Sequence, residues 1–287
     1  MKNKLKIKTF NNGDDHDGFG VTSTIIYGTT EAMIVDAQFT LANAHRLTAE
    51  AIEIDREISF IFITHMHPDH FLGLSVLHEA FPKARVIAFG DCADEINSAY
   101  DFKIEYWGYK VLGRNGSKSK IPVERFDDAQ LLLDGFPISF FGPMRGDASK
   151  CVVVWVESIS TLIAADTVFD KAHVWLADAR TPGMRAAWLE TLAFLASLKP
   201  EIVVPGHSPK QALRSPEAIS FTRQYILDFE AQWKLSSDSK ELIERMDALY
   251  PELPVKICLE YSAKILKDQW CWDGDWPESL RYTKSVM

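Results

Sequence analysis

Three histidines and one aspartate crowd a short stretch that directly follows an apolar run. The stretch is Thr64-His65-Met66-His67-Pro68-Asp69-His70, and the run before it is Ile58-Ser59-Phe60-Ile61-Phe62-Ile63. Short β-branched and aromatic runs of this kind are typical of buried strands. Because alternate residues of an extended chain point the same way, His65 and His67 can face one point. Asp69 and His70 can approach it from beyond the Pro68 bend, so the stretch predicts a site for one metal ion, or for two close together.

Imidazole and carboxylate ligands together suit Zn²⁺, and also Mn²⁺ or Fe²⁺, whereas an all-oxygen cluster would suit calcium or magnesium. The sequence does not choose among the first three metals. An isolated histidine is more often a structural residue, and His45 and His78 are interpreted in that way because neither has a clustered partner. Because His65, His67 and His70 lie so close together in the sequence, we interpret them as metal ligands and not as structural residues.

The composition is that of a globular protein with a substantial core. The chain has 287 residues, of which 47% are hydrophobic and 25% charged. A formal net charge of -9 argues against a nucleic-acid partner, and no apolar run is long enough for a membrane span. The basic residues 1–8 are not followed by an apolar segment, so no secretory signal is expected and the cytoplasm is the default location. A small-molecule substrate is the expected partner, and a homo-oligomer is left open.

The four cysteines are dispersed, with no Cys-x-x-Cys spacing. They indicate neither a zinc ribbon nor a redox motif. We expect reduced and mostly buried thiols.

Hydrophobic periodicity predicts two blocks of strands covered by helices. In the first block, strands are predicted at 22–27, 32–37, 58–63 and 85–89, with helices at 41–54 and 71–81. In the second, antiparallel strands are predicted at 130–133, 138–141, 151–156 and 161–165, followed by a helix at 183–198, a strand at 201–204 and a helix at 216–234. Residues 100–125 show no clear pattern.

The tail beyond residue 236 is expected to form one or two further helices. We therefore predict a domain at 1–235 and a helical C-terminal extension at 236–287 packed on it. The tail carries Trp270, Trp272 and Trp276, which are interpreted as aromatic cover for the domain, or as an oligomer contact, rather than as a substrate lid.

Two further polar residues follow predicted strands and are candidate ligands for the same metal site. Asp166 comes directly after Ala164-Ala165, and His207 ends Val203-Val204-Pro205-Gly206-His207. Catalytic groups often lie on loops that a rigid sheet positions. Either residue alone would be interpreted as a cap or a surface group, but with the cluster both become candidate ligands.

With these residues the chain resembles the metallo-β-lactamase-fold metallo-hydrolases, which share a His-x-His-x-Asp-His signature, a later Asp after a strand and a late Gly-His. The resemblance extends from about Val21 to Phe229. It implies an α/β fold, a four-layer αββα sandwich, with the site at one edge between two sheets. It also implies that Asp36, at the end of Met33-Ile34-Val35-Asp36, supports the metal loop by hydrogen bonding.

Carried onto this chain, the family's two-metal arrangement would place His65, His67 and Asp166 in a first site. Asp69, His70, Asp166 and His207 would form the second site, which is complete. The first site lacks the family's middle histidine, because no His occurs between His78 and His173.

Alignment puts Arg145 near the missing ligand, and a guanidinium has no lone pair for a metal. Three interpretations follow. The first site binds metal with an added water or Asp147; or only the second site is filled and Arg145 supplies the lost positive charge; or the protein is a degenerate member with weak or no metal.

The resemblance implies hydrolysis of a small ester, lactone, amide or thioester by metal-activated water, with one or two zinc ions, or Mn²⁺ or Fe²⁺. Asp69 is the expected proton-handling residue and Arg145 the expected oxyanion partner. The alternatives are an iron-dependent oxidoreductase of the same fold and a non-catalytic ligand-binding member. The resemblance and the aromatic residues predict a pocket from segments near 14–19, Trp107, His173 and Trp175, which favours an apolar or ring-bearing substrate.

Overall fold

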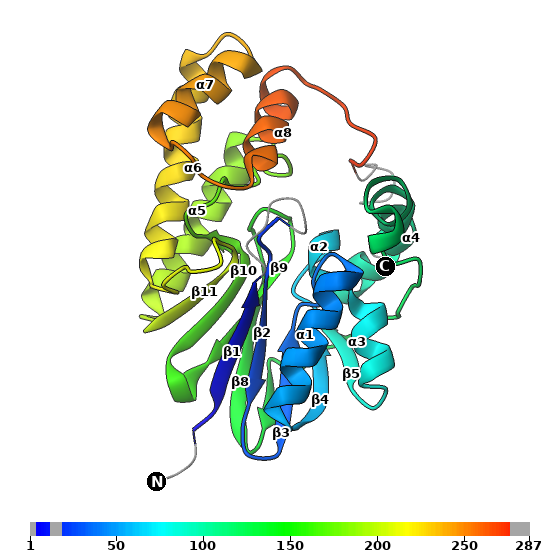
Figure 1. Cartoon of the computed structure of the whole chain (residues 1–287). Coiled ribbons are helices and arrows are strands. Elements are labelled where there is room, and N and C mark those ends of the chain that lie inside the picture. Colours follow the sequence, from blue (N-terminus) through cyan, green and yellow to red (C-terminus); the bar gives the residue numbers. More distant parts are fainter. Residues whose placement is uncertain (1–3, 12–18, 276–287) are drawn as a thin grey trace, which may run out of the picture.

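Two β-sheets lie face to face with helices on both outer sides in the computed structural model (Figure 1). The structure describes residues 4–11 and 19–275. The predicted αββα sandwich with C-terminal helices is therefore confirmed. Among the described residues, no helix combines the length and apolar character needed to cross a bilayer.

The first sheet has six strands in sequential order. They are β1 (Lys6–Asn11), β2 (Thr22–Tyr27), β3 (Glu31–Val35), β4 (Glu57–Phe62), β5 (Arg85–Phe89) and β6 (Glu124–Phe126). Strands β1 to β3 pair antiparallel, and β3 to β6 pair parallel. The ends of β3 and β4 therefore lie at the same edge of the sheet, which brings Asp36 beside the residues that follow β4.

The second sheet has five strands in the order β11-β10-β9-β8-β7. They are β7 (Gln130–Leu133), β8 (Phe136–Met144), β9 (Cys151–Val156), β10 (Thr161–Phe169) and β11 (Ile202–His207). Strands β7 to β10 are antiparallel as predicted, and β11 pairs parallel with β10. Parallel pairing puts the ends of β10 and β11 together, and these ends carry Asp166 and His207.

Helices cover the two outer faces (Figure 1). On the first sheet these are α1 (Leu41–Ile54), α3 (Leu74–Ala80) and α4 (Cys92–Lys103), with the short α2 (Pro68–Phe71) at the sheet edge; on the second they are α5 (Pro182–Ser197) and α6 (Glu217–Leu235). Both long helices that begin after a threonine are capped by its hydroxyl: Thr40 accepts from the Asn43 N–H, and Thr181 from the Met184 N–H.

The C-terminal helices α7 (Ser239–Leu249) and α8 (Lys256–Lys267) extend the second helical layer. Their buried residues Leu242, Met246 and Leu259 belong to the same apolar cluster as Trp188 of α5. The predicted boundary at residue 235 stays a prediction. Cys92, Cys151 and Cys258 are buried and Cys271 is exposed, and within the described residues none of the four forms a disulfide.

Four parts of the first half differ from the predicted elements. The expected helix 71–81 is interrupted after α2, because the Gly73 N–H donates to the carbonyl of Gln38 instead of continuing the helix. Strand β1 and helix α4 are additional elements that were not predicted, although Ala93, Ile96 and Tyr100 of α4 do follow a helical period. The patternless region 100–125 contains a π-helix, η1 (Ile104–Val111), a 3₁₀ turn, η2 (Gly113–Asn115), and strand β6.

Stacked aromatic rings join the two sheets. Phe62 of β4 and Phe140 of β8 have ring centroids 4.5 Å apart and planes only 9° from parallel. Phe140 also contacts the rings of Phe89 and Phe126. One side chain of the second sheet thus packs against three strands of the first.

We expect Phe140→Ala to lower the free energy of unfolding by about 3–5 kcal/mol, because it removes this ring from the interface and leaves a cavity. Chemical denaturation measures the change. Leu132→Ala is the control, since Leu132 lies in neighbouring β7 and is 65% exposed, and it should shift stability by less than about 0.5 kcal/mol. Equal losses in the two variants would contradict this account of the core.

Candidate metal centre

Asp36 holds the histidine loop against the sheet edge. It follows β3 with a positive φ of 63°, and its N–H donates to the carbonyl of Phe62 at the end of β4 (2.9 Å). Its Oδ1 accepts from the backbone N–H of Thr64 (2.9 Å), and its Oδ2 lies 2.7 Å from Nδ1 of His70. Asp36 therefore supports the loop and orients one histidine, in the position expected for it.

Each of the four clustered histidines has one ring nitrogen engaged away from the site. The contacts are His65 Nδ1 with Thr64 Oγ1 (3.0 Å), His67 Nε2 with Asp178 Oδ2 (3.4 Å), His70 Nδ1 with Asp36 Oδ2 (2.7 Å) and His207 Nδ1 with the Phe19 carbonyl (2.8 Å). A carbonyl or carboxylate only accepts, so the facing nitrogen of His67, His70 and His207 carries the proton. The Thr64 hydroxyl donates to Asp36 and therefore accepts from His65 Nδ1. The other nitrogen of each neutral ring then presents its lone pair inward, as a metal ligand must.

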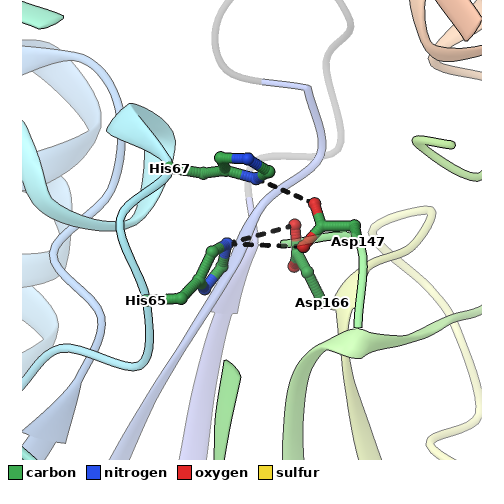
Figure 2. Close-up of side chains that lie close together, drawn as sticks. All are labelled: His65, His67, Asp147 and Asp166. Carbon is green, nitrogen blue, oxygen red and sulfur yellow. Dashed lines mark ion pairs between the residues drawn. The ribbon is translucent and has the colours of Figure 1, made fainter. Parts of the chain in front are cut away.

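Four of the inward atoms form a first group (Figure 2). The residues are His65, His67, Asp147 and Asp166, all buried, with ligand atoms within 4.8 Å of one another. His67 Nδ1 lies 2.8 Å from Asp147 Oδ2, while His65 Nε2 lies 3.8 Å from Asp147 Oδ1 and 3.7 Å from Asp166 Oδ2. Two imidazoles from the β4 loop therefore face two carboxylates from the second sheet.

Asp69, His70 and His207 form a second group, also within 4.8 Å. Asp166 lies between the two groups: its Oδ1 is 3.1 Å from His70 Nε2, and its Oδ2 is 3.0 Å from His207 Nε2. Asp69 Oδ2 lies 3.3 Å from the same His207 nitrogen. The shared position of Asp166 suits a site for two metal ions.

Gly206, directly before His207, makes room for this shared carboxylate. A Cβ at residue 206 would overlap Asp166 Oδ1 and the carbonyl group of Ala165. In the late Gly-His pair, packing therefore requires the glycine at position 206, while His207 is the candidate ligand.

Buried polar atoms in the cluster fit a bound cation. His65 Nε2, His70 Nε2 and Asp166 Oδ1 are buried, and within the described residues none of them has a hydrogen bond of good geometry, although His70 Nε2 and Asp166 Oδ1 lie 3.1 Å apart as an ion pair. A buried polar atom without a well-formed hydrogen bond costs about 1–3 kcal/mol, and more for a charged group. A divalent cation coordinated by these lone pairs would remove that cost, and the nitrogen-oxygen donor set is one that Zn²⁺, Mn²⁺ or Fe²⁺ accepts.

Asp147, and not Arg145, lies beside the two histidines of the first group. Asp147 lies in the loop between β8 and β9, where its N–H donates to the Asp166 carbonyl (3.1 Å). The Arg145 guanidinium instead donates to the backbone carbonyl of Asp178. The expected role of Arg145 as the replacement charge is therefore not what the geometry shows, because its guanidinium is tied to a neighbouring loop while the carboxylate two residues later faces His67.

A cleft opens above the ligands, with about 650 Å³ of empty space including its mouth. Trp107 and Trp175 line it as predicted, together with His67, Asp69 and His207. His173 does not line it: its Nδ1 lies 2.9 Å from the Tyr225 hydroxyl, and the ring is buried beneath the C-terminal helices. Of the predicted segment 14–19, only Phe19 falls within the described residues, and it lines the cleft.

Sequence reasoning missed Asp178 and Trp272. Asp178 Oδ2 accepts from the Trp175 indole N–H (2.8 Å) and faces His67, so it links a cleft wall to a candidate ligand. Neither residue belongs to a local motif. For Asp178, the one signal available in the sequence was its Trp-x-x-Asp spacing from Trp175.

Burial and neighbouring carboxylates set the protonation of the metal-free cluster. Burial lowers the pKa of every ring, and for His65 it prevails, aided by the nearby His70, so that its pKa falls well below the usual value. For His67 and His207 the effect of burial is outweighed by Asp147 and by Asp166, respectively, and each pKa rises to about 10. Both rings are therefore protonated at neutral pH when no metal is bound.

A family model agrees with this geometry. The model of the metallo-beta-lactamase superfamily matches residues 16–207, which include all the candidate ligands. The chain belongs to this superfamily, as the resemblance implied. A search of curated protein sequences gave no match.

Solved structures of the same class share the fold. A metallo-beta-lactamase family protein from Thermus thermophilus has a TM-score of 0.64 at 17% identity, covering 92% of this chain and 91% of that one. A metallo-beta-lactamase from Pontibacter korlensis has a TM-score of 0.57 at 18% identity, covering 79% and 97%. The FIM-1 enzyme from Pseudomonas aeruginosa, in its mono-zinc form, has a TM-score of 0.56 at 15% identity, covering 78% and 91%.

We expect Asp147→Ala to reduce bound zinc from about two ions per chain to about one, because the first group loses the carboxylate that faces both of its histidines. Metal analysis of zinc-loaded, desalted protein measures the ratio. Arg145→Ala should keep both ions, since its guanidinium contacts a backbone carbonyl outside the groups. The reverse outcome, with loss of an ion only in the Arg145 variant, would contradict the assignment.

Metal binding should release protons and strengthen with pH. The neutral rings of His67 and His207 are the metal-binding forms, and both have a metal-free pKa of about 10. Despite burial, the pKa of His70 is also raised well above its usual value by the neighbouring carboxylates, so zinc must displace up to about three protons near neutral pH, and the apparent affinity should rise between about pH 7 and pH 9. Calorimetry in buffers of different ionisation enthalpy counts the protons, and a count of zero would contradict protonated histidines in the metal-free protein.

Proposed function

We propose that this protein is a zinc-dependent hydrolase of a small ester, lactone, amide or thioester, and that it acts through metal-activated water. The observation that carries the proposal is the meeting of two buried ligand groups at Asp166, at the floor of an open cleft. Membership of the metallo-beta-lactamase superfamily supports it. One structure of similar fold is described as a mono-zinc form, which is consistent with zinc here.

Bound at these groups, a divalent cation would lower the pKa of a coordinated water toward about 7 and polarise the substrate oxygen. His65, His67, Asp147 and Asp166 would hold one ion, and Asp69, His70, His207 and the shared Asp166 the other. Proton handling and the shaping of the substrate cleft would depend on side chains of the protein.

Asp69 is the side chain best placed to handle the proton of the attacking water. It lines the cleft, lies beside His207 and His70, and stands at the start of α2. Burial raises the pKa of its carboxyl, but the neighbouring His70 and His207 outweigh this and lower it to about 2. The carboxylate is therefore ionised at neutral pH and can accept a hydrogen bond that orients the water.

Aromatic side chains give the cleft apolar walls, which would limit the contact of a bound substrate with bulk water. Trp107, Trp175 and Phe19 contribute apolar walls directly above the ligands. A drier site strengthens the electrostatic stabilisation of a developing oxyanion. Arg145 has no part in this proposal, because its guanidinium is directed at the Asp178 carbonyl.

Hydrolysis assays across lactone, β-lactam, thioester and phosphoester panels test the proposal, with metal quantified in the same natively purified samples. We expect turnover of a carbonyl substrate that a chelator abolishes and Zn²⁺ restores. Asp69→Asn should lower kcat by about 10²–10⁴-fold, the usual contribution of a positioned acid or base. His45→Asn is the control, since His45 lies on α1 among no candidate ligands.

Three outcomes would contradict this proposal, and two of them would favour an alternative. Undiminished turnover after chelation would exclude a metal-dependent hydrolase. Native protein that contains iron and consumes oxygen would favour the oxidoreductase of the same fold. A protein that binds no metal and gains no thermal stability from Zn²⁺ would be the non-catalytic member.

A further inference from the structure

We propose that the cleft takes a substrate in which a flat aromatic ring without positive charge is attached to the hydrolysed bond, and that Trp272 of the C-terminal segment selects this ring. The inference rests on the proposed function, because it concerns the same cleft. It also revises the interpretation of the tail tryptophans as mere cover.

The cleft walls are aromatic on the sides that rise above the ligands. The aromatic side chains lining it are Phe19, Trp107, Trp175, Tyr261 and Trp272. They come from distant parts of the chain: the segment before β2, the π-helix η1, the loop after β10, helix α8 and the segment that follows it. Aromatic rings prefer edge-to-face or offset contact with another ring, so such walls favour a flat ring over a saturated one.

Trp272 connects these walls to one another. Its ring centroid lies 5.8 Å from that of Trp107, 6.2 Å from that of Trp175 and 5.3 Å from that of Tyr261. The ring planes are inclined by 64–75°, which is edge-to-face geometry. A substrate ring in the cleft would therefore contact Trp272 and also an aromatic wall residue, either Trp107 from the first half of the chain or Trp175 from the second.

The segment that carries Trp272 is fastened over the cleft at its far end. It leaves α8 and crosses toward the α4 side of the molecule (red in Figure 1). Asp275 pairs with Arg180 at 2.5 Å, which ties the segment to the loop that carries Trp175. Gly274 lets the chain pass close to the indole, since a Cβ there would overlap the rings of Trp272 and Tyr106.

The carboxylates that line the cleft already face partners, which argues against a ring that carries a positive charge. The Asp178 carboxylate accepts from Trp175 and faces His67, and Asp275 pairs with Arg180. Asp69, Asp147 and Asp166 belong to the ligand groups. The apolar walls thus bind the ring, while the hydrolysed bond lies toward the floor.

Binding of three carboxylates to the zinc-loaded full chain tests the proposal without requiring turnover. The probes are phenylacetate, cyclohexylacetate and acetate, which share the anion and differ only in the attached group. We expect phenylacetate to bind about tenfold more tightly than acetate and several-fold more tightly than cyclohexylacetate, as aromatic contacts predict. Isothermal titration calorimetry gives the dissociation constants.

Trp272→Ala should remove most of the phenylacetate preference, and Trp272→Phe should keep most of it. Trp270→Ala is the matched control: Trp270 lies in the same segment and contacts Tyr261 (5.1 Å), but it does not line the cleft. It should leave the preference unchanged. If Trp272→Ala fails to fold, as thermal unfolding shows, Trp272→Leu replaces it as a variant that retains an apolar side chain.

Two results would overturn the inference: equal affinity of the wild-type protein for phenylacetate and cyclohexylacetate, or an unchanged preference in a folded Trp272→Ala or Trp272→Leu variant. Failure of the hydrolase proposal is distinguishable. In that case the zinc-loaded protein would prefer phenylacetate through Trp272 but hydrolyse no member of the carbonyl panels.

Discussion

The carboxylate of Asp166 is the point on which the site depends. It is buried between two groups of ligand atoms and lies within 3.1 Å of the ring nitrogens of His70 and His207. A buried carboxylate is stable only when opposite charge and hydrogen bonds compensate its lost hydration. Protonated histidines supply that charge in the metal-free protein, and bound cations would supply it in the loaded one. The fold brings the required partners from both sheets to this one carboxylate.

Each candidate histidine ligand is oriented by a contact outside the cluster. Asp36 holds both the loop and His70, Thr64 and Phe19 engage His65 and His207, and Asp178 faces His67. These contacts leave the inward nitrogen of each neutral ring to the metal. Asp178 is itself held by Trp175, and its carbonyl accepts from Arg145. The loop that shapes the cleft is thus connected to the ligands that form its floor, and arginine at position 145 acts as a tether and not as a replacement ligand.

The predictions succeeded where the signal was local and failed where it was not. The signature from His65 to His70, the strand before Asp166 and the Gly-His pair are contiguous patterns; the strands that precede them are confirmed, and their polar residues lie together in two groups that could hold metal. Helix α1 is predicted to the residue because its apolar period is uninterrupted. The region around η1 could not be predicted, since a π-helix has a period of its own and its aromatic residues face a cleft rather than a continuous core. His173 was misplaced because its contact with Tyr225 joins residues far apart in the chain.

The sequence by itself determined the class of the protein, because the His-x-His-x-Asp-His run and the strands around it are local features that packing does not alter. It also limited the candidate metals to ions that bind nitrogen and oxygen ligands together. Only the tertiary structure decided between Asp147 and Arg145, which are two residues apart but point to different partners. It alone brought Trp272 to the cleft, because contacts between the end of the chain and η1 depend on how the layers pack. Spacing along the chain carries no information about such contacts.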